Sequence, residues 1–129
     1  MNLWVDDIRP APEGWTLAKT VTEAIRVLAT QKVSEVSLDH DISHSIFFNG
    51  IHRPYPCGET FEPVAHYLHL LACAWENHEL YQDAKQPPES VNIHTANPVA
   101  AKKMSEILSR HYKVTITLGK PCNRFEGEA

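Results

Sequence analysis

The sequence has little cysteine, and its cysteines follow no recognisable spacing. Three of them, an odd number, occur in 129 residues, at Cys57, Cys73 and Cys122, and no pair has the CxxC spacing of redox or metal-binding motifs. Such a set gives no support for the disulfide framework that holds many small secreted domains together. We therefore expect reduced thiols and a cytoplasmic protein.

Long hydrophobic runs and long blocks of like charge are also absent. The longest apolar stretch, Val64 to Trp75, is interrupted by His66 and His69, so it is too short and too polar to span a bilayer. The N-terminus has no basic region followed by an apolar segment, and Asp6 and Asp7 interrupt it early, so we expect no secretory signal. The formal net charge of −4 disfavours nonspecific binding to duplex nucleic acid or to an anionic membrane.

The remaining composition, 43% apolar and 22% charged, is that of one ordinary globular domain spanning residues 1–129. Short apolar runs alternate with segments of helical periodicity, which favours a mainly parallel sheet of five strands flanked by helices. Strands are predicted at 2–5, 16–19, 35–38, 90–95 and 112–118, and helices at 20–30, from 63 onward, and at 98–110. An irregular insertion is predicted at about 42–62, which is long for a compact domain.

Four carboxylates lie where two of the predicted strands end. Asp6 and Asp7 follow the first strand, and Asp39 and Asp41 follow the strand that ends at Leu38. The carboxyl ends of parallel strands lie at one edge of the sheet, where α/β proteins place their functional sites. The four carboxylates would therefore converge there and repel one another unless a cation lay between them. Carboxylate oxygens suit Mg²⁺ or Mn²⁺, ions often shared with phosphate groups. The sequence predicts a metal site here, although not all four residues need to be ligands.

Polar residues next to these carboxylates extend the predicted site. His40 and His94 are candidate general acids or bases, with a core hydrogen bond or a metal ligand as the alternative for each. Arg9 is a candidate phosphate ligand, or else a partner in a salt bridge with Glu13 or Asp7.

Two further segments complete the set of candidate phosphate ligands. Asn97 is expected to cap the helix that begins at Pro98, and the start of that helix, with Thr95 beside it, is also an anion site. Lys120-Pro121 follows the last predicted strand.

The order of these polar groups resembles the receiver domains of two-component signalling, which have a flavodoxin-like α/β fold. The motifs Asp-Asp-Ile-Arg-Pro, Leu-Asp-His-Asp and His-Thr-Ala-Asn-Pro further resemble the cyclic-phosphate-processing receiver domain family of bacteria and phages. The resemblance implies that Asp6 and Asp7 hold the metal and that Asp39 or Asp41 matches the acceptor aspartate. It also implies that Thr95 and Lys120 contact phosphoryl oxygens.

The chain also departs from ordinary receivers, which have a helix after the first strand and another after Lys-Pro. Without these two helices, which cover the same face of the sheet in receivers, the fold would be a three-layer sandwich with one face largely bare, or a two-layer sandwich. We expect Trp15, or the insertion with its apolar residues between Ile46 and Tyr55, to cover that face, or two copies to pair through it as a homodimer. The same insertion could form a lid over the site.

The predicted function is therefore a metal-dependent phosphoesterase acting on a cyclic phosphate or a cyclic nucleotide. The alternatives are a receiver-type phosphoacceptor module and a protein that binds a cyclic nucleotide without cleaving it. A dedicated zinc site is a lesser alternative: His66 and His69 could share a metal, with Cys57 nearby in sequence, but no run has the paired spacing of a zinc finger.

Overall fold

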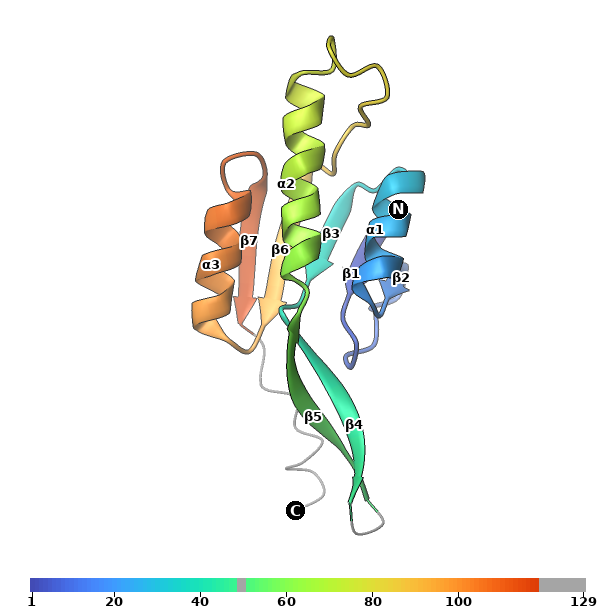
Figure 1. The fold of residues 1–129 in the computed structure, drawn as a ribbon, viewed down its shortest axis with the longest axis vertical. Helices are drawn as coiled ribbons and strands as arrows, with labels where there is room; N and C mark the ends of the chain where they lie inside the picture. Colours follow the sequence, from blue (N-terminus) through green and yellow to red (C-terminus); the bar gives the residue numbers. More distant parts are fainter. Residues whose placement is uncertain (49–50, 119–129) are drawn as a thin grey trace.

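The computed structural model describes the backbone of residues 1–48 and 51–118 and the side chains of residues 1–42 and 60–118. Its centre is a five-stranded, all-parallel sheet in the order β2-β1-β3-β6-β7 (Figure 1). The strands are β1 (Asn2–Val5), β2 (Trp15–Ala18), β3 (Glu35–Leu38), β6 (Ser90–Thr95) and β7 (Lys113–Leu118). This order is that of flavodoxin-like sheets, so the predicted receiver-like α/β fold is confirmed.

Three helices cover one face of this sheet (Figure 1), which gives two layers. They are α1 (Val21–Thr30), α2 (Glu62–Glu76) and α3 (Pro98–Leu108). As predicted, the connection from β1 to β2 contains no helix. The segment in which a helix would follow β7, together with Lys120, lies outside the described residues. None of the helices in the described part of the chain is long and apolar enough to cross a lipid bilayer.

The predicted helix starts are confirmed at two caps. The Oγ1 of Thr20 accepts a hydrogen bond from the backbone N–H of Glu23 at 3.0 Å, and the Oδ1 of Asn97 accepts one from Ala100 at 3.1 Å. Each bond satisfies an N–H group that has no partner within the helix, which fixes where α1 and α3 begin.

The core lies between the helices and alternate residues of the strands. Leu3, Val36 and Val91 occupy neighbouring positions on β1, β3 and β6 and are almost completely buried. Together with the apolar faces of the three helices they form one continuous cluster. Because strand side chains alternate between faces, the residues between these positions lie on the face opposite the helices.

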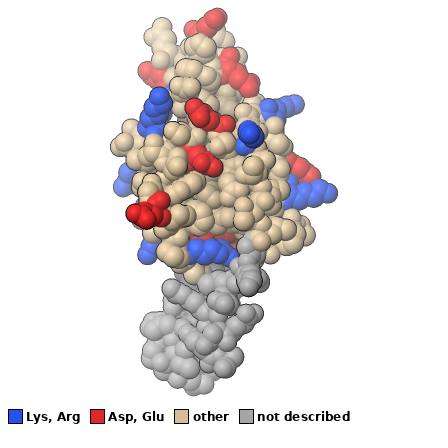
Figure 2. Space-filling model, turned by 180° about the vertical axis from the view of Figure 1, so that it is seen from behind, with Lys and Arg blue, Asp and Glu red and all other residues tan. Residues whose placement is uncertain are grey.

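On β3, β6 and β7 that opposite face is polar where an apolar surface was expected, whereas Trp4 of β1 packs edge-on against Trp15, with ring centroids 6.0 Å apart. The Oγ of Ser37 accepts a hydrogen bond from Nδ2 of Asn92 at 3.0 Å, and Oδ1 of Asn92 accepts one from Thr115 at 2.8 Å. Seen from this side, the molecule has an uncharged area flanked by acidic and basic groups (Figure 2). On these three strands the polar row removes the physical reason for expecting a cover, since the side chains satisfy one another. A homodimer through this face stays a prediction.

The insertion is regular, so the prediction of an irregular stretch was wrong. Strands β4 (Asp41–Phe48) and β5 (Ile51–Thr60) pair antiparallel and form a separate two-stranded sheet. Figure 1 shows this hairpin extending away from the end of the parallel sheet, and it does not lie over the face opposite the helices. The side chains of Ile46 to Tyr55, on which the predicted cover and lid depend, lie outside those that the structure describes.

Candidate functional site

The carboxyl ends of β1, β3 and β6 bring three predicted site residues together. Asp6 directly follows β1, Asp39 directly follows β3, and His94 is the penultimate residue of β6. All three are buried, and one ligand atom from each lies within 4.8 Å of the others. Parallel strands end at the same edge of the sheet, which explains why positions 88 residues apart in the chain meet here.

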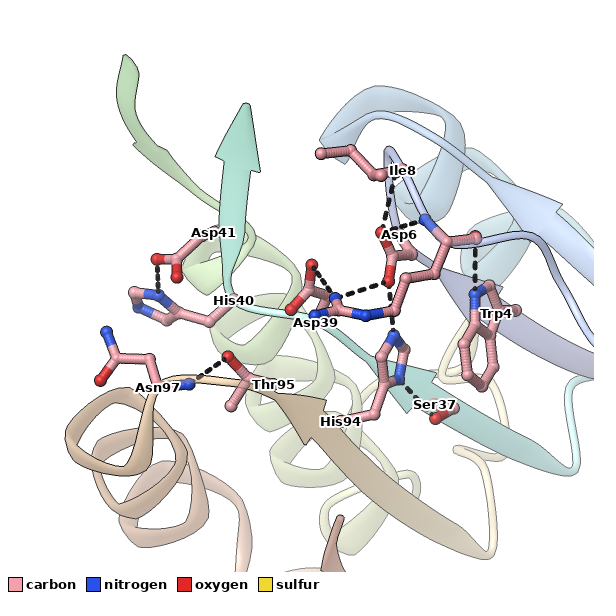
Figure 3. Close-up of polar contacts among 11 residues, drawn as sticks. Trp4, Asp6, Ile8, Ser37, Asp39, His40, Asp41, His94, Thr95 and Asn97 are labelled. Carbon is pink, nitrogen blue, oxygen red and sulfur yellow. Dashed lines mark hydrogen bonds and ion pairs between the residues drawn. The ribbon is translucent and has the colours of Figure 1, made fainter. Parts of the chain in front are cut away.

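The carboxylate of Asp6 is held by the chain around it. Its Oδ1 accepts hydrogen bonds from the backbone N–H groups of Ile8 at 2.9 Å and Arg9 at 3.0 Å. Its Oδ2 lies 2.9 Å from Nε2 of His94 (Figure 3). Burial raises the pKa of Asp6, but these hydrogen bonds outweigh burial and leave that pKa below its usual value. Asp6 is therefore a fixed negative charge at the centre of the site.

A cation does lie between the two acidic strand ends, and it belongs to the protein. The Nη1 of Arg9 is 3.3 Å from Oδ2 of Asp6 and 3.4 Å from Oδ2 of Asp39. The Arg9 side chain is 27% exposed, whereas both carboxylates are buried. The guanidinium is thus the component of this cluster that solvent or a ligand can reach.

Asp39 differs sharply from Asp6 in its electrostatic environment. Burial raises the pKa of Asp39 to about 7, the negative charge of Asp6 adds to this rise, and a smaller contribution comes from Asp7. The hydrogen bond from His40 and the charge of Arg9 act in the opposite direction. Two neighbouring carboxyl groups with separated pKa values are the pattern of a site that keeps one group charged and uses the other for proton transfer.

His94 is enclosed rather than open to a ligand. Its ring stacks on that of Trp4, with centroids 3.9 Å apart and an interplanar angle of 10°. Its Nδ1 lies 2.7 Å from Oγ of Ser37, and its Nε2 contacts Asp6. With a neutral ring, Ser37 donates to Nδ1 while Nε2–H donates to Asp6, and this chain of bonds continues to Asn92. Both ring nitrogens are engaged, so the geometry favours orientation of Asp6 by His94.

His40 forms a second, separate polar group. Its Nδ1 is 2.7 Å from Oδ1 of Asp41, and its Nε2 is 3.2 Å from Oε2 of Glu62. In Figure 3 His40 and Asp41 lie on one side of the chain, while Asp39 points to the other side. There Asp39 pairs with Arg9. Asp41 is 51% exposed and lies outside the cluster of Asp6, Asp39 and His94.

Glu62 is the one residue of this second group that the sequence did not suggest. It contacts His40 and also forms an ion pair of 3.2 Å with Lys103. The hydrogen bond from His40, together with Lys103, lowers the pKa of Glu62. In the sequence, Glu62 could be recognised only as a carboxylate in the first turn of a predicted helix. Its contact with His40 could not be predicted, because it depends on the hairpin bringing the start of α2 back next to β3.

Two predicted phosphate ligands, Thr95 and Asn97, lie between the end of β6 and the start of α3. The Oγ1 of Thr95 accepts a hydrogen bond from the backbone N–H of Asn97 at 3.1 Å, and Asn97 caps the helix. Thr95 is almost completely buried, whereas Asn97 is partly exposed, so the start of the helix is the part of this group that an anion can approach.

One of the comparisons with known proteins identifies a family. The family model of the cyclic-phosphate processing Receiver domain matches residues 1–110. No curated protein and no solved structure matches the chain. The matched region contains every candidate site residue named above except Lys120.

Proposed function

The chain belongs to the cyclic-phosphate processing receiver domain family, and on that basis we propose that it is a phosphoesterase that opens a cyclic phosphate, with cyclic nucleotides as the first substrate class to test. One observation carries the proposal. Arg9 contacts both Asp6 and Asp39, and the pKa of Asp39 is raised to about 7, so a phosphate-binding cation and a group that exchanges protons near neutral pH share one edge of the sheet.

Opening a cyclic phosphate adds water across one P–O bond. The attacking water loses a proton, and the leaving oxygen gains one. Asp39 is suited to one of these transfers because its pKa lies close to the working pH. His40, held between two carboxylates, is the candidate for the other. Asp6 and His94 fix the position of Arg9, whose planar guanidinium can pair with two phosphoryl oxygens.

A divalent metal, Mg²⁺ or Mn²⁺, is part of the proposal. The carboxylates fit such an ion, since one oxygen of Asp6 and one of Asp39 lie within 4.8 Å of each other, and the charge of Asp7 acts on Asp39. When bound, the metal would polarise the phosphoryl group. A bound ion would compete with Arg9 for these carboxylate oxygens, and the guanidinium would then be available to a phosphate group.

The experiment is incubation with a panel of cyclic mono- and dinucleotides, with Mg²⁺, with Mn²⁺ and with EDTA, followed by mass spectrometry of the products. We expect a gain of one water by one ligand class, in the presence of metal, and loss of this turnover in Asp6→Asn and Asp39→Asn. Asp83→Asn, an exposed carboxylate outside the site, is the matched control. Turnover retained in both site variants would refute the proposal.

A phosphoacceptor role is the second candidate, and the position of Asp39 directly after β3 favours it. Acetyl phosphate would then label Asp39, while Asp41, which is half exposed and lies outside the cluster, would stay unlabelled. A stable acyl phosphate without turnover of any cyclic phosphate would favour this role. Ligand binding without conversion would favour a protein that sequesters a cyclic nucleotide.

A further inference from the structure

A second cluster of ligating side chains lies away from the candidate site, on the later half of α2. His69 and Cys73 are four residues apart on this helix, so they lie on the same face. His111, from the turn between α3 and β7, approaches the same face. One ligand atom from each of these three residues lies within 4.8 Å of the others.

The distances match those of a tetrahedral metal centre. The Sγ of Cys73 is 3.6 Å from Nε2 of His69 and 3.7 Å from Nε2 of His111. Bond lengths of about 2.3 Å for zinc to sulfur and about 2.0 Å for zinc to nitrogen, at the tetrahedral angle, place sulfur and nitrogen about 3.5 Å apart. The three side chains therefore need little movement to hold one ion.

The surroundings of His111 also fit a metal ligand. The Nδ1 of His111 lies 2.7 Å from Oε1 of Glu76, so a carboxylate orients the ring and leaves Nε2 directed at Cys73. A ring nitrogen paired with a carboxylate in this way is the usual outer contact of a metal-bound histidine. The His111 side chain is only 4% exposed.

Hydrogen bonding alone gives a poor account of His69. Its Nδ1 is buried and has no hydrogen-bond partner in the described part of the chain, and its Nε2 faces only a thiol. A thiol is a weak donor and a weak acceptor, so burying an imidazole against it costs free energy. A metal ion bound at Nε2 would give that nitrogen a strong partner in place of the thiol, while Nδ1–H would still have none among the described residues.

We propose that His69, Cys73 and His111 bind one Zn²⁺ ion, which links α2 to the turn that precedes β7. One thiolate and two imidazoles are the soft and intermediate ligands that zinc prefers, and three protein ligands leave a fourth position for water or a small ligand. Cys73 lies eleven residues after Glu62, about 16 Å along the helix, so the site is separate from the phosphate site. The ligand set differs from the grouping that the sequence suggested, because His66 is exposed.

The test uses the reduced full-length protein with Co²⁺ as a spectroscopic probe and Zn²⁺ as a competitor. A sulfur-to-cobalt charge-transfer band reports a bound thiolate, so cobalt at the phosphate site does not contribute to it. We expect this band to saturate at one equivalent of Co²⁺ and to disappear when one equivalent of Zn²⁺ is added. Cys73→Ser and Cys73→Ala should both lose the band, and Glu76→Gln should weaken zinc binding by about 10-fold to 100-fold.

Cys122→Ser and His66→Gln are the matched controls, and both should keep the band and the zinc affinity of the parent protein. Circular dichroism of each variant without metal shows whether it is folded. A folded Cys73→Ala protein that retains the band would overturn the proposal. Failure of the parent protein to show any thiolate band would also overturn it, whatever the outcome of the phosphoesterase assays.

Discussion

Arg9 and Asp39, thirty positions apart in the chain, form an ion pair of 3.4 Å between Nη1 and Oδ2. Asp6 shares the same Nη1 at 3.3 Å, so one guanidinium lies against the two acidic strand ends. The protein thus supplies the cation that the clustered carboxylates require. This arrangement sets up a competition between Arg9 and a metal ion for the same oxygens, and the competition can be measured.

Replacing Arg9 with Gln should separate metal binding from turnover. We expect Mn²⁺ to bind more tightly because a competing positive charge is lost. Turnover at saturating metal should fall by about 10²-fold to 10³-fold, since a donor to the phosphoryl oxygens is lost. Metal titration and product assays measure the two effects, with the exposed Arg110→Gln as the control. Unchanged turnover would show that Arg9 serves only as a structural counter-ion.

Replacing Asp39 with Asn should change how stability depends on pH. The pKa of Asp39 is about 7 in the folded protein against an ordinary value of 3.8, so the folded state binds more protons than the unfolded state between these values. The parent protein therefore loses stability through Asp39 as pH rises from 4 through 7, by about 2–3 kcal/mol between pH 5 and pH 8. Asp6 stays charged in both states across this window, because its folded pKa is lowered.

In Asp39→Asn that part of the pH dependence should disappear. Urea unfolding of both proteins at pH 5 and pH 8 measures the difference, with Asp83→Asn as the control. An equal pH dependence in Asp39→Asn and the parent protein would mean that Asp39 has an ordinary pKa. Such a result would also weaken its proposed role in proton transfer.

Replacing Ser37 with Ala should show how much the polar row on the open face contributes to the free energy of unfolding. The change removes the partner of Nδ1 of His94 and of Nδ2 of Asn92, and we expect a loss of about 1–3 kcal/mol in the free energy of unfolding. Ser34→Ala, at an exposed position just before β3, should change it by less than about 0.5 kcal/mol. Equal stabilities for the two variants would contradict the importance of this row.

Replacing His40 with Gln tests the second polar group. If His40 transfers a proton, turnover should fall by about 10²-fold to 10⁴-fold while the midpoint of thermal unfolding stays close to that of the parent protein. Asp41→Asn should cause a smaller loss, because Asp41 is half exposed and Glu62 still contacts the ring. A larger effect from Asp41→Asn than from His40→Gln would reverse the assigned roles.

The sequence predicted local structure well where a short pattern decides it. Thr20 and Asn97 cap the helices that they were expected to cap, and the strand at Ser90–Thr95 has the predicted bounds. Its alternation of Ser90, Asn92 and His94 with apolar residues also indicated a sheet covered on one side only. The expectation of an apolar open face was therefore wrong at this strand. The hairpin was missed because β4 and β5 pair with each other, and no local pattern in the sequence predicts that pairing.

By itself, the sequence determined the order of the five parallel strands and three helices and the placement of carboxylates at strand ends, because apolar periodicity and capping act over a few residues. Only the tertiary structure decided which polar groups meet. Asp6, Asp39 and His94 converge because three parallel strands end at one edge, and Arg9 reaches them because the turn after β1 folds back on Asp6. Likewise, His111 joins α2 only through the packing of the sheet and helices. Contacts of this kind depend on the register of distant segments, which no local pattern contains.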